Sequence, residues 1–182
     1  MKPSLVLLDR DGVINEDRPD SVKSIEELVL IDGSAEAIAM LNQAGIKVAV
    51  VTNQSVVGKG IISQQELDDI HSALAEQLAE HGAHWDALFV ATDHPDQPTH
   101  RRKPEPGMLL EALEAFDTQA EQAPMVGDAL RDMQAAHTAG CPRYLVRTGK
   151  GQALEQEGLP QDLEPVEVHD NLLSLVKKLL QS

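Results

Sequence analysis

Two kinds of residue are scarce in this 182-residue chain, and each scarcity excludes a class of structure. Cysteine occurs once, at Cys141, so the chain can form neither an intrachain disulfide nor a zinc site built from cysteines. Aromatic residues make up only 2% of the chain, so we expect a core of Leu, Val, Ile and Ala side chains.

Positive charge and long apolar runs are also scarce. The 15 Lys and Arg residues face 30 Asp and Glu residues, which gives a net charge of −15. We expect no binding to nucleic acid or to an anionic membrane surface, because both partners select basic patches. No apolar run approaches the roughly 20 residues that span a membrane, and the run at 5–8 ends in Asp9, unlike a signal peptide. The expected location is therefore the cytoplasm.

The remaining composition is that of a globular protein, with 42% apolar residues over a length that suits one domain, residues 1–182. Apolar runs of strand length alternate with helical patterns, which predicts an α/β fold with a mainly parallel sheet between two helical layers. Ser63 and Glu66 form a capping-box pattern, and Gly45, Gly82 and Gly140 stand where helices should end. The expected strands are 5–8, 46–51, 87–91, 124–126, 143–146 and 166–169, and the expected helices are 34–44, 63–81, 107–116, 130–139 and 171–180.

The first expected strand runs directly into two aspartates, Asp9 and Asp11, followed by Gly12. Ligands of an open parallel sheet bind outside the carboxyl ends of its strands. Two carboxylates there repel each other unless a cation lies between them, and Mg²⁺ prefers carboxylate oxygens. The segment therefore indicates a metal-assisted site with one carboxylate free to attack a substrate. The alternative is an Asx-type turn with solvated charges.

Three further clusters follow later strands. The first holds Thr52 and Asn53, where a hydroxyl and backbone amides suit a phosphate oxygen but are also ordinary turn chemistry. The second, residues 101–107, contains Arg102 and Lys103, which suit an anion or form a solvated basic loop. The third holds Asp128 and Asp132, and Asp128 alone would also read as a helix cap. A parallel sheet brings all four clusters to one edge.

Taken in order, these motifs resemble the haloacid dehalogenase (HAD) superfamily of phosphotransferases. Within it, the segments LLDRDGVIN, VTNQS, RKPEPGM, VGDALRDMQAA and RTGKG are similar to the D-glycero-D-manno-heptose 1,7-bisphosphate phosphatase family. The resemblance implies a Rossmann-like fold without a large cap domain. It also implies a Mg²⁺-dependent phosphatase for a small sugar phosphate, most directly the 7-phosphate of the heptose bisphosphate used in lipopolysaccharide-core or related nucleotide-heptose synthesis. Separately, we expect a monomer or weak homodimer, because no apolar stripe on the helices requires a dimer.

The resemblance also implies a role for each matching residue. Asp9 matches the nucleophile and Asp11 the general acid and base, while Thr52 and Lys103 match the groups that hold the transferred phosphoryl. The other implied roles are Mg²⁺ ligation by Asp9, Asp128 and the backbone carbonyl of Asp11, support by Asp132, and substrate contacts from Asn53, Arg102 and Lys59.

The chain departs from the family pattern in two places. Many members carry a zinc loop of three Cys and one His before the Arg-Lys-Pro motif, but residues 91–101 hold no cysteine, so no structural zinc is expected. In some members a Lys follows the residue that matches Asp128, whereas this chain has Ala129 there. The histidines at 71, 81 and 84 are expected at the surface.

Two other functions remain as alternatives. One is a phosphatase for another small phosphomonoester, such as histidinol phosphate. The other is a phospho-aspartate receiver module, which also combines acids, a Ser or Thr and a Lys on an α/β sheet. In receivers paired acids follow the first strand and the phospho-acceptor follows the third. Here the acids after the first strand are spaced D-x-D, and Thr92-Asp93 after the third strand lacks the receiver pattern.

Overall fold

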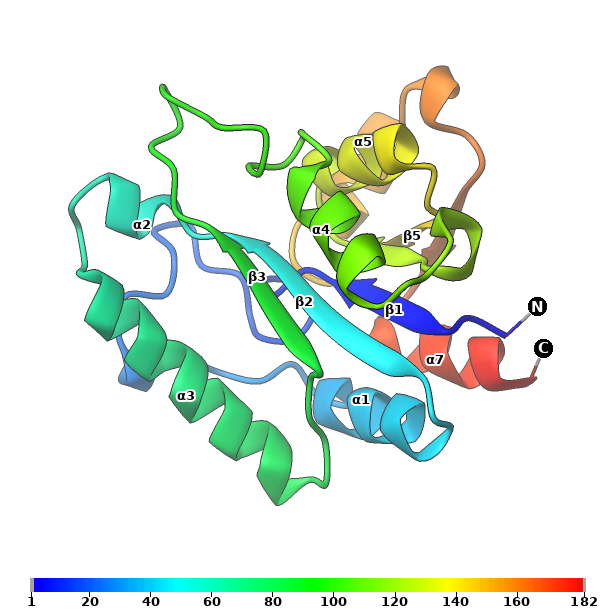
Figure 1. Cartoon of the computed structure of the whole chain (residues 1–182), viewed down its shortest axis with the longest axis horizontal. Helices are drawn as coiled ribbons and strands as arrows, with labels where there is room; N and C mark the ends of the chain where they lie inside the picture. The colour runs from blue at the N-terminus through cyan, green and yellow to red at the C-terminus, as the bar shows by residue number, and fades with distance from the viewer. Residues whose placement is uncertain (1, 182) are drawn as a thin grey trace.

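The computed structural model describes residues 2–181 and shows six parallel strands in the order β3-β2-β1-β4-β5-β6 (Figure 1). All neighbouring pairs run parallel, as in Leu8 with Val50 of β2 and Val126 of β4. This confirms the predicted parallel α/β fold, with no antiparallel strand in the sheet. The strands are β1 (Leu5–Leu8), β2 (Lys47–Asn53), β3 (Ala87–Ala91), β4 (Met125–Gly127), β5 (Arg143–Val146) and β6 (Val166–His169).

Helices cover both faces of the sheet, because successive side chains of a strand point to opposite faces. Val6 and Leu8 of β1 pack into a core shared with α1, α3 and α7, and Leu5 and Leu7 pack into one shared with α4 and α5. Figure 1 shows these two helical layers on either side of the sheet. The α-helices are α1 (Ser34–Gln43), α2 (Ser55–Gly58), α3 (Gln64–Glu80), α4 (Gly107–Ala115), α5 (Leu130–Ala139), α6 (Gly151–Glu157) and α7 (Leu172–Gln181).

The predicted elements agree with the structure to within two residues at each end. The capping box of α3 is confirmed: Ser63 Oγ accepts the Glu66 amide, and the Glu66 carboxylate accepts the Ser63 amide. The sequence analysis missed α2 and α6 and the 3₁₀ turns η1 (Ile25–Glu27), η2 (Ala120–Gln122) and η3 (Gln161–Leu163). These pieces are too short for periodicity to reveal and depend on tertiary contacts.

The long α3 is amphipathic rather than apolar, and it buries one face against the sheet. Within residues 2–181, no helix combines the length and the apolar character that crossing a membrane requires.

Candidate active site

Three buried carboxylates meet at the carboxyl edge of the central strands. Asp9 follows β1, Asp128 follows β4, and Asp132 lies in the first turn of α5. One oxygen from each lies within 4.8 Å of the others, and none of the three residues is more than 2% exposed. The parallel sheet thus brings together acids that are more than 100 residues apart in the sequence, as the strand-end argument predicts.

Among residues 2–181, two of these carboxylates each keep a buried oxygen that has neither a hydrogen-bond partner nor an ion-pair partner. Asp9 Oδ1 accepts the Arg10 amide at 2.8 Å, whereas Asp9 Oδ2 accepts none. Asp128 Oδ2 accepts the Lys150 amide at 2.9 Å, whereas Asp128 Oδ1 accepts none. Buried polar atoms without partners are uncommon and costly. Two free anionic oxygens in one buried cluster are the ligand type that Mg²⁺ prefers, so Asp9 and Asp128 fit such an ion.

The pKa values of Asp9 and Asp128 are both raised. Burial raises the pKa of Asp9 to about 6, against the opposing charge of Lys103. Burial and the charges of Asp9 and Asp132 raise the pKa of Asp128 to about 7. Without a cation the folded state therefore binds protons here more tightly than the unfolded chain does.

Lys103 is the cation built into the cluster, and its side chain is fully buried. Its Nζ lies 3.0 Å from Asp9 Oδ1 and 2.7 Å from Asp132 Oδ1, and it donates to the Val51 carbonyl at 2.8 Å. The Asn53 side chain makes two hydrogen bonds to the backbone of Lys103. Its Nδ2 donates to the Lys103 carbonyl, and its Oδ1 accepts from the Lys103 backbone N–H. The structure therefore places Lys103 between the candidate nucleophile and the supporting acid.

Both carboxylate oxygens of Asp132 have partners, unlike those of Asp9 and Asp128. Its Oδ2 accepts the Ala129 amide at 3.0 Å, while its Oδ1 faces Lys103. These contacts hold the turn after β4 and orient Lys103, which agrees with a supporting position.

The loop after β5 closes over Asp128 and orients it. Thr148 Oγ1 donates to the Gly12 carbonyl at 2.6 Å, and the Lys150 amide donates to Asp128. Gly149 has φ +59°, and a Cβ atom built there would overlap the Asp128 carboxylate. Only a glycine fits, because both the positive φ and the close approach exclude a side chain. This contact gives the RTGKG segment a structural role that its pattern alone did not indicate.

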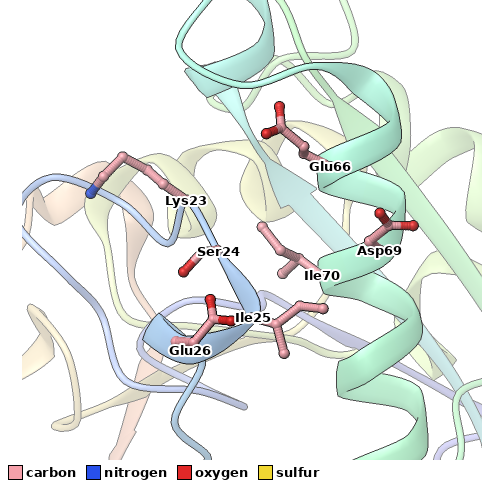
Figure 2. A pocket seen from close by; sticks show the side chains of 7 residues that line it. All are labelled: Lys23, Ser24, Ile25, Glu26, Glu66, Asp69 and Ile70. Atoms are coloured by element: carbon pink, nitrogen blue, oxygen red, sulfur yellow. The ribbon is translucent and has the colours of Figure 1, made fainter.

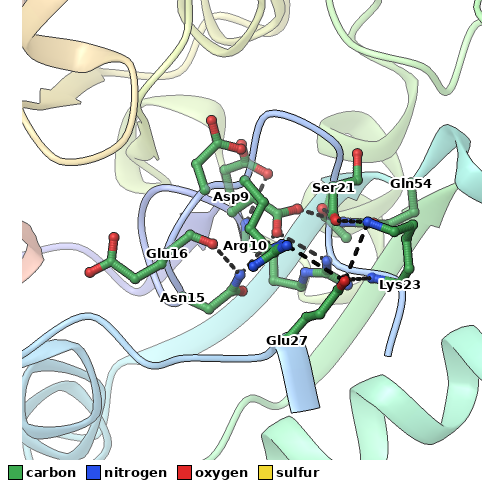
Figure 3. Close-up of polar contacts among 12 residues, drawn as sticks. Asp9, Arg10, Asn15, Glu16, Ser21, Lys23, Glu27 and Gln54 are labelled. Carbon is green, nitrogen blue, oxygen red and sulfur yellow. Dashed lines mark hydrogen bonds and ion pairs between the residues drawn. The ribbon is translucent and has the colours of Figure 1, made fainter. Parts of the chain in front are cut away.

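Asp11 lies apart from the buried cluster and is held by three side chains. Its Oδ1 accepts from Arg10 Nη2 at 3.0 Å and from Asn15 Nδ2 at 2.9 Å, and its Oδ2 accepts from Gln54 Nε2 at 2.7 Å. Figure 3 shows Arg10, Asn15 and Gln54 gathered beside the loop that follows β1. Burial would raise the pKa of Asp11, but the Arg10 charge and these hydrogen bonds together lower it below its usual range. Gln54 also donates to Thr52 Oγ1 at 2.9 Å, which links Thr52 to the same network.

A polar cavity of about 120 Å³ opens beside Asp11 and contains most of the cations near the site. Arg102 Nη1 and Arg131 Nε are buried there without hydrogen-bond partners. The pKa of Arg102 is lowered, because its guanidinium is partly buried and is repelled by the neighbouring charge of Arg131. Two neighbouring cations with unused donors suit an anionic ligand. The lining residues are Asp11, Asp17, Arg18, Pro19, Ser21, Asn53, Gln54, Ser55, Arg102, Arg131 and Lys150.

The sequence analysis missed Arg131, Lys150 and Gln54 as members of this cavity. An arginine in the first turn of α5 carries no distinguishing pattern, and only the fold turns it toward the cavity. Lys59, predicted to contact the substrate, is exposed at the end of α2 and does not line the cavity.

One expectation about the histidines is wrong. His81 and His84 are exposed, but His71 is only 5% exposed and lies 3.0 Å from Arg10 Nη1. The helical pattern of α3 places position 71 on its buried face beside Ile70 and Leu74, a pattern the sequence analysis did not apply to a histidine.

A second hollow, of about 190 Å³, lies between η1 and α3 (Figure 2). Ile25 and Ile70 form its apolar part, and Glu26, Glu66 and Asp69 surround them. These carboxylates would repel a phosphate group, so the hollow is not the candidate site.

In the part of the chain that the structure describes, the loop before Lys103 does not bring three His, Cys, Asp or Glu side chains together. Across residues 2–181, the acidic cluster is the one place where three or more His, Cys, Asp or Glu side chains converge on a possible ion. In the loop, Asp93 accepts the Thr99 amide and His94 Nδ1 accepts the Asp96 amide, so these side chains stabilise the turn.

Comparison with known proteins relates this chain to HAD-like hydrolases. The HAD-hydrolase-like family model matches residues 100–175. D-glycero-beta-D-manno-heptose-1,7-bisphosphate 7-phosphatase from Bordetella bronchiseptica is 42% identical over 178 residues, which cover 97% of this chain and 98% of the relative. The enzyme of the same name from Pseudomonas aeruginosa is 39% identical over 181 residues, with full coverage of both chains.

Solved structures agree with these sequence relatives. The crystal structure of D,D-heptose 1,7-bisphosphate phosphatase from B. bronchiseptica, complexed with magnesium and phosphate, matches with a TM-score of 0.93 and 41% identity, covering 100% of this chain and 99% of that one. The structure from Burkholderia thailandensis matches with a TM-score of 0.77 and 37% identity, covering 98% and 99%.

Proposed function

Because the chain belongs to the D-glycero-β-D-manno-heptose-1,7-bisphosphate 7-phosphatase family of HAD-like hydrolases, we propose that it removes the 7-phosphate of heptose 1,7-bisphosphate with the help of Mg²⁺. The observation that carries this proposal is the pair of unpartnered carboxylate oxygens, Asp9 Oδ2 and Asp128 Oδ1, buried in one cluster. A nucleophile and a metal ligand both require such an oxygen.

Asp9 is the nucleophile of the proposed reaction. An oxygen of its carboxylate attacks phosphorus, and the bond from phosphorus to the sugar oxygen breaks. Asp11, protonated once the phosphate dianion lies beside it, donates its proton to that oxygen. Asp11 then takes a proton from water, the water oxygen attacks phosphorus, and the bond to Asp9 breaks. Inorganic phosphate leaves, Asp9 is again a carboxylate and Asp11 is again a carboxylic acid.

Asp9, Asp128 and the backbone carbonyl of Asp11 would hold the Mg²⁺ ion. When bound, it supplies positive charge that offsets the repulsion between the Asp9 carboxylate and the incoming phosphate. The magnesium and phosphate bound to the related Bordetella enzyme support this assignment.

Lys103 and Thr52 hold the phosphoryl oxygens in this mechanism. Phosphoryl transfer spreads negative charge over three oxygens, so fixed donors and cations contribute most of the catalysis. The Lys103 ammonium is positioned for this by Asp132, the Val51 carbonyl and Asn53. It pairs with Asp9 Oδ1, whereas Asp9 Oδ2 has no partner among residues 2–181.

The phosphate that is not hydrolysed binds in the cation-lined cavity. Arg102 and Arg131 offer unused donors there, and Lys150 lies at the same cavity, 3.3 Å from Asp17. Lys59 and Asn53 are further proposed contacts, with Lys59 reaching from the end of α2 and Asn53 from the end of β2.

The same proposal includes three expectations about the whole molecule. Residues 1–182 act as one phosphatase domain, the enzyme is a cytoplasmic monomer or weak homodimer, and it carries no structural zinc. Metal analysis of protein purified without a metal-affinity tag tests the last point, and one zinc per chain would contradict it. Sedimentation at micromolar concentration tests the oligomeric state.

Phosphate release with Mg²⁺ from a substrate panel tests the function. The panel holds both anomers of heptose 1,7-bisphosphate, histidinol phosphate, fructose 1,6-bisphosphate and an aryl phosphate. We expect kcat/KM for one heptose anomer to exceed the rest at least a hundredfold, about 2.7 kcal/mol of transition-state discrimination. Asp9→Asn should abolish release from every substrate. Equal, low activity across the panel would contradict the heptose assignment, and an active Asp9→Asn variant would contradict the mechanism.

A further inference from the structure

The buried side of Asp11 is connected to helix α3 through a chain of two side chains. Arg10 is fully buried, and its guanidinium donates from Nη2 to Asp11 Oδ1 at 3.0 Å. Its Nη1 lies 3.0 Å from Nε2 of His71. One guanidinium therefore bridges the carboxylate beside the cavity and an imidazole on the inner face of α3.

The direction of the second hydrogen bond follows from the chemistry of the two groups. A guanidinium has donors and no acceptor, so His71 Nε2 must accept, and the ring is neutral with its proton on Nδ1. Burial and the charge of Arg10 lower the pKa of His71 to about 4, against the opposing charges of Asp11 and Asp68. A neutral acceptor at this position is compatible with a buried cation, whereas a protonated histidine would repel it.

Among residues 2–181, His71 and Asp11 are the two groups that bond to the side-chain nitrogens of Arg10, and Arg10 Nε is buried without a partner. Removing the imidazole would leave Nη1 buried without an acceptor. Such a group is costly, and the guanidinium would reorient to relieve it. Asp11 would then lose the hydrogen bond from Nη2 and be held only by Asn15 and Gln54, with less constraint on its orientation.

We propose that His71 is a positioning residue for Asp11: it accepts the Arg10 hydrogen bond and thereby keeps the carboxylate aligned with the leaving oxygen of the substrate. The inference rests on the proposed function, because it takes the acid and base role of Asp11 from there. A position held by contacts on several sides is what proton transfer in a transition state requires. His71 does not line the cavity beside Asp11.

Two variants at His71 and one control separate positioning from packing. In His71→Gln, the side-chain carbonyl oxygen can take the place of Nε2 and accept from Arg10. His71→Leu fills the space without an acceptor. Leu74→Ala removes packing from the same face of α3, where Leu74 is fully buried. It removes neither partner of the Arg10 hydrogen bonds.

The readout is kcat/KM for two leaving groups, measured at a temperature where every variant is folded by circular dichroism. The sugar oxygen of heptose bisphosphate needs a proton as it leaves, whereas an aryl oxygen leaves without one. We expect His71→Leu to lower kcat/KM at least tenfold for the sugar substrate and less than threefold for the aryl phosphate. His71→Gln should stay within threefold of the unsubstituted enzyme on both, and Leu74→Ala should leave the ratio between the substrates unchanged.

Three results would overturn the inference: wild-type kinetics in His71→Leu, equal losses on the two substrates, or equal losses in His71→Leu and His71→Gln. Failure of the proposed function looks different, because the unsubstituted enzyme would then not hydrolyse the heptose substrate. In that case any alkyl phosphate that it does hydrolyse replaces the sugar in the same comparison. If Asp9→Asn remains active, the shared mechanism is wrong.

Discussion

Replacing Lys103 by Met should destabilise the protein strongly, because the change leaves buried carboxylates without their cation. Methionine keeps much of the apolar stem of the side chain but removes the ammonium that lies 3.0 Å from Asp9 and 2.7 Å from Asp132. Breaking a buried ion pair by removing one partner costs about 3–5 kcal/mol. For a domain of this length each kcal/mol lowers Tm by about 2–4 °C, so we expect a decrease of roughly 6–20 °C.

The pH dependence of this loss follows from the remaining carboxylates. Removing the cation raises the pKa of Asp9 further, because Lys103 opposes the effect of burial, so the folded variant takes up protons more readily than the unfolded chain. Protonation relieves the repulsion, and the destabilisation should be smaller at pH 5.5 than at pH 8.

A second substitution tests whether charge is the cause. Asp132→Asn keeps an oxygen to accept the Ala129 amide but removes one negative charge from the cluster. In the double variant Lys103→Met/Asp132→Asn, part of the lost stability should return, and a double-mutant cycle measured by urea unfolding gives the coupling energy. A Lys103→Met protein within about 1 kcal/mol of the unsubstituted protein at pH 8, or no coupling in the cycle, would refute the reasoning.

Three further predictions use other contacts of the structure. Gly149→Ala should lower Mg²⁺ affinity, measured by titration calorimetry, because the added methyl overlaps the Asp128 carboxylate; affinity equal to that of the unsubstituted protein would contradict the close approach. In metal-free protein, the raised pKa values of Asp9 and Asp128 should make stability fall as pH rises from 5 to 8, because their folded-state protons are lost over that range. Mg²⁺ should therefore raise Tm more at pH 8 than at pH 5.5, and an equal rise at both would argue against binding at these acids. Ser63→Ala should cost about 1 kcal/mol in urea unfolding through loss of the α3 cap, and a Ser63→Thr protein of normal stability serves as its control.

Much of the fold was predictable because its elements are locally encoded. The strand at 5–8 is a continuous apolar run, as a strand buried on both faces should be, and α3 begins at a capping box. The alternation of such elements leaves few topologies open, since parallel strands need crossover connections. The short helices α2 and α6 carry no such local signal, and the sequence analysis missed both.

The positions of Asp9, Asp128, Asp132 and Lys103 at the site were also predictable. Asp9 and Asp128 directly follow strands, and Asp132 lies in the helical turn after β4, so the sheet brings these acids to one edge. Lys103 lies in the loop between β3 and α4, which starts from the same edge. Their roles as nucleophile, ligand and supporting group remain predictions that the proposed experiments test.

The sequence by itself determined the parallel fold, the family and the edge at which the acids meet. The reason is that the spacing of apolar residues, the residues that follow each strand and the order of the motifs can all be read directly from the chain. Only the tertiary structure decided which oxygens of Asp9 and Asp128 stay free, which arginines enter the cavity, and that His71 is buried against Arg10. These features depend on side chains from α3, α5 and the loop after β5 that approach one another across the fold. A hydrogen bond between residues 61 positions apart leaves no mark in the spacing of either one.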